Sequence, residues 1–160
     1  MEIALNPESK RKSAAAVAFR DGERMFGSDA MAVAVKYPKN CYFYLLDLLG
    51  KKIDHPAVKL FQERFPFYDI EADPERGTVV FKHDEETKYT VEELVGMILS
   101  HAKDIAEDYT EQKLREVVIT VPVFFNQVTE MLLLKLFIQL QVSQMKQTAT
   151  YILYALKPLS

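Results

Sequence analysis

The chain has 160 residues, of which 49% are hydrophobic and 27% charged, values that are ordinary for one globular domain with a core. Its net charge of −3 gives no reason to expect nucleic acid or an anionic membrane as a partner, and the single cysteine, Cys41, excludes an internal disulfide and a cysteine-based zinc site. No window reaches the ~20 apolar residues of a membrane span, and no apolar run of secretory length predicts a signal peptide.

Short extended segments alternate with turns at the start of the chain. Residues 1–6 (MEIALN) alternate apolar and polar side chains, which is typical of a strand. Residues 13–19 (SAAAVAF) form a second strand candidate, and Asp21-Gly22 predicts a turn into a further extended segment.

Two apolar helices are predicted next. Ser28 or Asp29 is suited to cap a helix that Pro38 ends. Residues 41–50 (CYFYLLDLLG) are apolar over most of their surface, and Gly50 is a typical residue for the end of a helix.

A short helix between Pro56 and Pro66 precedes a section that is typical of strands. Residues 67–72, 78–84 and 87–90 alternate apolar and polar side chains. We therefore expect a small antiparallel meander with one exposed face.

The clearest pattern lies in residues 90–111 (TVEELVGMILSHAKDIAEDYTE), where apolar residues recur in steps of three and one. This spacing places them on one face of a helix, and Thr90 with Glu93 forms a capping box at its start. Residues 116–121 (EVVITV) are apolar without alternation, as expected for a strand that is covered on both faces. A helix is expected to open near Gln127.

Motifs for phosphate binding, metal binding and catalysis are not found in the sequence. No two of the five glycines are closer than five residues, so neither GxGxxG nor a P-loop is present. His101 lies off the apolar face of its helix, and we expect it to face solvent. The run from His83 to Glu86 resembles a metal cluster, but charges in a turn are more simply solvated.

Six segments, read in chain order, match one known layout. They are MEIALNPESKRKSAAAVAF, GERMFGSDA, PKN, LLGKKI, VEELVGMILSHAKDIAEDY and VVITVPVFFNQ. In order and spacing they resemble the nucleotide-binding domain of the heat shock protein 70 chaperones, over roughly Met1 to Gln127. The large endoplasmic-reticulum members of that family are the most similar.

This resemblance implies a mixed α/β fold: part of the first lobe of an actin-like, ribonuclease-H-like ATPase with an inserted α+β subdomain. The family binds ATP and Mg between two lobes and acts on unfolded polypeptides, and its large endoplasmic-reticulum members also assist a smaller heat shock protein 70 chaperone. The endoplasmic reticulum lumen is the expected location, with the cytoplasm as the alternative. The chain begins after the family's Gly-Thr-rich phosphate loop, so we expect that on its own it does not bind ATP and Mg.

Three positions within the resemblance bear on nucleotide chemistry. Leu46 stands where smaller members carry a catalytic lysine, and leucine can neither orient water nor neutralise phosphate charge. Pro122 matches the proline of the family's interlobe switch, although we favour a simple strand end here. Glu130 stands where an arginine is expected, and its carboxylate would repel phosphate. Phe124 and Phe125 are expected to be core aromatics.

Residues 128–160 depart from the family and are assigned to a divergent, apolar helical tail, distinct from residues 1–127. The polar positions Lys135, Gln139, Ser143 and Lys146 follow one narrow stripe, and the other side chains are mostly apolar. Such a helix requires burial on nearly all sides. We therefore expect exposed leucines and self-association through the tail.

Two functions of different classes follow. The first is a fragment of the ATP-binding domain of an ATP-dependent chaperone, which serves protein folding in the endoplasmic reticulum and the stress response. The second is a non-enzymatic protein-interaction module, or an inert degenerate copy, that keeps the surface of the lobe without its chemistry. Titration with Mg-ATP distinguishes the two.

Overall fold

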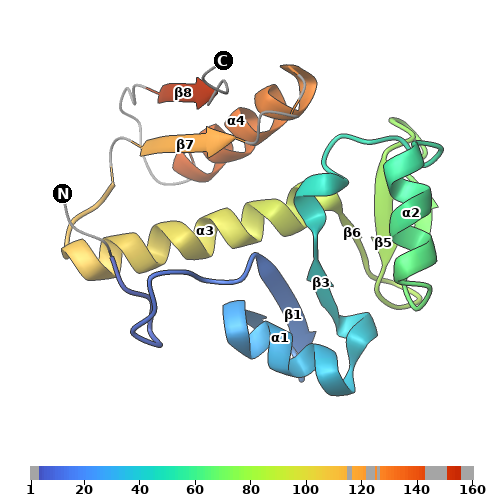
Figure 1. Cartoon of the computed structure of the whole chain (residues 1–160), viewed down its shortest axis with the longest axis horizontal. Coiled ribbons are helices and arrows are strands. Elements are labelled where there is room, and N and C mark those ends of the chain that lie inside the picture. The colour runs from blue at the N-terminus through green and yellow to red at the C-terminus, as the bar shows by residue number, and fades with distance from the viewer. Residues whose placement is uncertain (1–3, 115–116, 122–124, 126, 143–150, 156–160) are drawn as a thin grey trace, which may run out of the picture.

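The computed structural model describes residues 4–114, 117–121, 125, 127–142 and 151–155. In chain order the elements are β1 (Ala16–Arg20), β2 (Glu23–Phe26), α1 (Gly27–Lys36), η1 (Pro38–Asn40), β3 (Cys41–Phe43), η2 (Leu45–Asp47), α2 (Pro56–Arg64), β4 (Asp69–Ala72), β5 (Val79–Lys82), β6 (Lys88–Thr90), α3 (Val91–Thr110), β7 (Val117–Val121), α4 (Gln127–Val142) and β8 (Tyr151–Ala155). α3 crosses the middle of the molecule, with β1 and α1 on one side and β7 and α4 on the other (Figure 1).

The first sheet has the antiparallel order β2-β1-β3. Asp21 and Gly22 both adopt positive φ angles, of 53° and 81°, and join β1 to β2. A two-residue turn with this backbone matches the twist of the strands it connects. The Asp21-Gly22 turn is therefore confirmed, and the strand predicted at residues 13–19 is confirmed from Ala16 onward.

The second sheet is the antiparallel meander β4-β5-β6, as predicted. It lies with α2 beside the N-terminal end of α3 (Figure 1). The side chains of β5 at Val79, Val80 and Phe81 are all buried, since this strand is central in the sheet. α2 begins at Pro56, also as predicted, and His55 caps it by accepting the N–H of Ala57 on its Nδ1 at 3.1 Å.

The long helix α3 confirms the prediction for residues 90–111 almost residue for residue. The Thr90 hydroxyl accepts the N–H of Glu93 at 3.1 Å, and the Glu93 carboxylate accepts the N–H of Thr90 at 2.8 Å. This reciprocal pair satisfies backbone donors that have no partner inside the helix. The apolar face then buries Val91, Leu94 and Val95.

A parallel strand pair follows α3. β7 and β8 pair from Val117 with Tyr151 to Val121 with Ala155, and α4 connects them. A parallel pair needs such a crossover. The start of α4 at Gln127 is confirmed, whereas β8 was not predicted. The expectation that residues 116–121 are covered on both faces is wrong at Thr120, which is exposed and borders a cavity.

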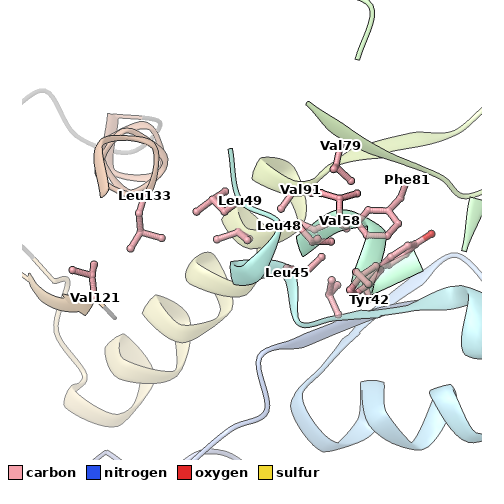
Figure 2. Close-up of a cluster of buried hydrophobic side chains, with 14 residues drawn as sticks. Tyr42, Leu45, Leu48, Leu49, Val58, Val79, Phe81, Val91, Val121 and Leu133 are labelled. Atoms are coloured by element: carbon pink, nitrogen blue, oxygen red, sulfur yellow. The ribbon is translucent and has the colours of Figure 1, made fainter. Parts of the chain in front are cut away.

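One large cluster of buried side chains joins these parts. It contains Tyr42, Leu45, Leu48, Leu49, Val58, Phe61, Val79, Phe81, Val91, Leu94, Val95, Val121 and Leu133, together with Val17. Figure 2 shows Val121 of β7 and Leu133 of α4 at one end of this cluster, and Tyr42 and Phe81 at the other. The core therefore runs past α3 from the second sheet to α4.

The predicted helix at residues 41–50 is wrong. Residues 41–43 form β3, which pairs with β1 from Ala16 with Phe43 to Ala18 with Cys41. Tyr44 then adopts a left-handed conformation, with φ 56° and ψ 27°, which interrupts any continuous helix before the short η2 turn. The apolar composition that suggested a helix instead reflects burial in a strand and a turn.

Two predictions nearer the N-terminus are also wrong. α1 begins at Gly27, ahead of both predicted capping residues, and the Ser28 hydroxyl instead donates to Glu8. Residues 4–6 are not in a strand, because the Asn6 side chain accepts the N–H groups of Glu8 and Lys10 and holds a turn; residues 1–3 lie outside the described part.

The first turns of α4 are packed more closely than the sequence suggested. Leu133 is 4% exposed, and Leu132 lies against the backbone of Gly50. Leu136 packs against the same core, while Met131 is exposed. The expectation of exposed tail leucines is therefore wrong for these positions, because α3 and the η2 region cover them. None of the helices in the described ranges combines the length and hydropathy that crossing a bilayer requires.

Gly50→Ala is expected to lower the free energy of unfolding by about 1–2 kcal/mol more than Gly77→Ala. Both glycines have positive φ angles, of 68° and 67°, so both variants carry the same backbone strain. A Cβ at Gly50 would lie 2.6 Å from the Cδ1 of Leu132, whereas one at Gly77 meets nothing within 4 Å.

Urea denaturation of the two variants measures this difference. Adding Leu132→Ala to each background should reduce it, since the methyl group that clashes is then removed. Equal losses of stability for both glycine variants would show that α4 does not rest on Gly50.

Cys41 should react with thiol reagents at pH 8 about a hundred-fold more slowly in the folded chain than in guanidinium. Its burial raises the pKa of the thiol from 9.0 to about 11, so little thiolate forms. The unfolded chain loses this proton first as the pH rises above 9, and the folded state loses stability there. Equal reaction rates with and without denaturant would contradict this placement of Cys41.

Candidate functional site

The η2 turn decides which side chains face outward between the two sheets. Leu45 is 2% exposed and belongs to the core, whereas Leu46 is 37% exposed. Tyr44, in its left-handed conformation, is 61% exposed. Asp47 is also exposed. The position where the family resemblance implied a catalytic lysine is therefore at the surface.

A first cavity, of about 620 Å³, opens on one side of this turn and is named here the apolar cavity. It is lined by Ala14, Ala15, Ala16, Met31, Phe43, Tyr44, Leu45, Leu46, Asp47, Val95, Ile98, Leu99, Ile119, Thr120, Phe125 and Leu133. Among the described residues of that lining, Asp47 is the one acidic side chain. The walls thus suit apolar groups and offer no cationic side chain.

A second cavity, of about 440 Å³, opens on the other side of the turn and is named here the basic cavity. It is lined by Tyr44, Leu46, Asp47, Lys51, His55, Ala57, Leu60, Phe61, Arg64, Phe65, Phe125 and Thr129. Leu46 lines both cavities, as do its neighbours Tyr44 and Asp47. Lys51 and Arg64 supply the positive charge.

Phe125, just before α4, and Thr129, in the first turn of α4, also line the basic cavity. Phe125 is half-buried, lines both cavities and packs against the main core, which confirms its prediction as a core aromatic. Thr129 is buried, and Glu130 beside it is half-buried. The structure thus brings Leu46 and Phe125 together around one pair of cavities. Pro122 and Phe124 lie outside the described residues.

Leu46 and the apolar cavity favour apolar contact over phosphate chemistry. Phosphate oxygens are bound most strongly by charged or backbone N–H donors. The Leu46 side chain has no polar atom, and the apolar cavity that it lines contributes a carboxylate from Asp47. Neither feature stabilises negative charge.

The sequence interpretation missed the basic cavity. Its charged members come from a loop (Lys51), a helix cap (His55) and the last residue of α2 (Arg64). The helical spacing of Ala57, Leu60, Phe61 and Arg64 was the signal that could have placed these side chains on one face of α2.

The segment His83–Glu86 forms a turn, as expected. The Asp84 carboxylate accepts the N–H groups of Thr87 and Glu86, and these hydrogen bonds lower the pKa of Asp84. His83 is more buried than a solvated turn residue, because its Nδ1 and the Tyr42 hydroxyl share a hydrogen bond of 2.9 Å. Across residues 4–114 and the shorter described ranges, no group of three His, Cys, Asp or Glu side chains is placed to hold a metal ion.

His101 is not the solvent-facing residue that its position on α3 predicted. Its ring stacks on that of Phe26, with centroids 4.3 Å apart and planes 9° from parallel. The side chain is half-buried because β2 and the start of α1 cover this part of α3. His101 is therefore a packing residue.

Comparison with known proteins assigns the chain to a family. Residues 1–130 match the family model described as Hsp70 protein. The chain belongs to the heat shock protein 70 family. The match includes the η2 turn, α2, α3, β7 and the first turn of α4, all of which contribute residues to the two cavities. The mixed α/β architecture is consistent with a partial ATPase lobe of the heat shock protein 70 family.

Several relatives within the family are named Hypoxia up-regulated protein 1. Those from Xenopus laevis and Danio rerio are 51% and 50% identical over 127 residues, and that from Homo sapiens is 46% identical over 127 residues. Each alignment covers 79% of this chain. The chain spans 20% of the length of the Xenopus laevis protein and 13% of the other two.

Leu46→Lys is expected to change the free energy of unfolding by less than about 0.5 kcal/mol, as most surface substitutions do. Leu45→Lys, one residue earlier, should cost more than about 3 kcal/mol because it buries a charge without a partner. Thermal or urea denaturation followed by circular dichroism compares the two. Similar losses for both variants would place Leu46 in the core and not at the cavities.

Proposed function

We propose that this chain forms part of the first lobe of the ATP-binding domain of a heat shock protein 70 chaperone. The observation that carries this proposal is the family match over residues 1–130, supported by 46–51% identity to the Hypoxia up-regulated protein 1 relatives named above. The name of these relatives supports a role in the stress response. The resemblance to the large endoplasmic-reticulum members supports protein folding in the lumen of that compartment as the setting.

ATP and Mg are the ligands of the complete domain in this proposal, and other parts of that domain supply most of the contacts. At the described surface, Leu46 provides no donor to a phosphate and Asp47 provides a negative charge. Glu130 adds a second carboxylate at the start of α4. Carboxylates beside a bound triphosphate would repel its negative charge. The isolated chain is therefore expected neither to bind nor to hydrolyse ATP.

The chain on its own is better suited to binding protein, which is the second candidate function. The exposed apolar side chains Met31, Tyr44 and Leu46 line the apolar cavity and favour this role. In the complete protein the proposed partners are unfolded polypeptides and a smaller heat shock protein 70 chaperone. Met131 on α4 is exposed and supports self-association through the tail as a further contact of the isolated chain.

Isothermal titration of the 160-residue chain with Mg-ATP is expected to show no binding tighter than about 1 mM, which corresponds to ~4 kcal/mol. Phosphate release should equal that of buffer, both for the natural chain and for a Leu46→Ala, Glu130→Ala double variant. The physical reason is that Leu46 supplies no donor and that no cationic side chain is among the described residues lining the apolar cavity, while Lys51 and Arg64 of the basic cavity share their lining with the Asp47 carboxylate.

A full-length relative such as Hypoxia up-regulated protein 1 serves as the positive control in the same titration. Micromolar binding by the isolated chain, or ATP turnover that the double variant abolishes, would refute the proposed inactivity. Either result would leave the family assignment unchanged.

A further inference from the structure

The basic cavity concentrates positive charge on a protein whose net charge is −3. Lys51 and Arg64 both line it, and in the described part of the chain neither forms an ion pair. Asp47 is the one acidic side chain among the described lining residues. His55 uses its Nδ1 to cap α2, so the neutral ring carries its remaining proton on Nε2 and can donate. The cavity is therefore matched in charge to an anionic ligand.

The rim of this cavity is apolar and open to solvent. Tyr44, Leu46 and Leu60 are 61%, 37% and 48% exposed. Large exposed apolar side chains that cluster beside a concave surface are typical of interaction sites. These side chains lie at the rim of the cavity. A ligand that contacts them and also fills the cavity must therefore be larger than the cavity.

The backbone at Tyr44 is held in an unfavourable conformation at this rim. Its φ of 56° lies in the left-handed region, which a bulky aromatic residue rarely adopts. The conformation stacks the Tyr44 ring on that of Phe65, with centroids 5.8 Å apart and planes 24° from parallel. Strained residues of this kind are found preferentially at functional sites. Here the strain presents two aromatic rings beside the cationic side chains.

From these three features we infer that the basic cavity binds an acidic peptide segment that carries a large apolar side chain. The apolar side chain packs against Tyr44, Phe65 and Leu60, and the flanking carboxylates pair with Lys51 and Arg64. A peptide fits better than a small aromatic acid, since it covers the exposed rim as well as the cavity. The cavity shares Leu46 and Asp47 with the surface considered above for nucleotide. The peptide titration contains no ATP, however, so its outcome is distinguishable from that of the Mg-ATP titration.

Fluorescence anisotropy tests the inference with a labelled peptide in which four glutamates stand on each side of one phenylalanine. The complete 160-residue chain should bind this peptide in the micromolar range at low salt, and binding should weaken as salt is added. A peptide with lysines in place of the glutamates, and one with serine in place of the phenylalanine, should bind at least about five-fold more weakly.

Charge-reversal variants locate the site. Lys51→Glu and Arg64→Glu should each weaken binding by about five-fold or more, whereas Lys59→Glu should stay within about two-fold. Lys59 is the matched control because it is exposed on α2, the helix that carries Arg64, but is not among the residues that line the cavity. Circular dichroism establishes that all three variants are folded.

Four results would overturn the inference. They are no binding of the acidic peptide at 1 mM, equal binding of the lysine peptide, equal loss of binding in Lys59→Glu, and binding of the free acid 4-hydroxyphenylacetate as tight as that of the peptide. The last result would assign the cavity to a small molecule.

Discussion

The packing of three leucines against the first turns of α3 holds the other parts of the molecule together. Leu45, Leu48 and Leu49 are buried in the same cluster as Val91 and Leu94, which are on the apolar face of α3. Each leucine removed from water contributes about 1.5–3 kcal/mol. Because these leucines lie between β3 and α2, their burial ties the first sheet to the second, and α4 rests on Gly50 just beyond them.

The same turn creates the candidate site. A chain that buries Leu45 and Leu48 in a single 3₁₀ turn must direct the side chains between them outward, and these are Leu46 and Asp47. The two cavities on either side of the turn consequently share their central wall. Their chemistry differs because α3 and β7 supply apolar side chains to one, while α2 and its flanking loop supply Lys51 and Arg64 to the other. The proposed roles in protein binding follow from that difference in lining.

Agreement between sequence and structure is closest where the signal is local. α3 was predicted from a long periodic pattern and a capping box, and both depend on residues within one helix. The meander was predicted from alternation along each strand. The helix predicted for residues 41–50 is wrong because an apolar segment without a clear period is equally compatible with a helix and a buried strand. The pairing of β3 with β1 decides between the two. The predicted cap at Ser28 is wrong for a related reason, since the Ser28 hydroxyl donates a hydrogen bond to Glu8, twenty residues away.

The amino-acid sequence by itself determined the family, the position of α3 and the second sheet. It also showed that a leucine, Leu46, stands where smaller members of the family carry a catalytic lysine. These follow from motif order, from periodicity and from single positions, which need no knowledge of distant contacts. Only the tertiary structure decided that Leu46 faces outward, that α4 is partly buried, and that Lys51, His55 and Arg64 share a cavity with Tyr44. The physical reason is that burial and cavity shape depend on which elements pack together, and each of those contacts joins residues far apart in the chain.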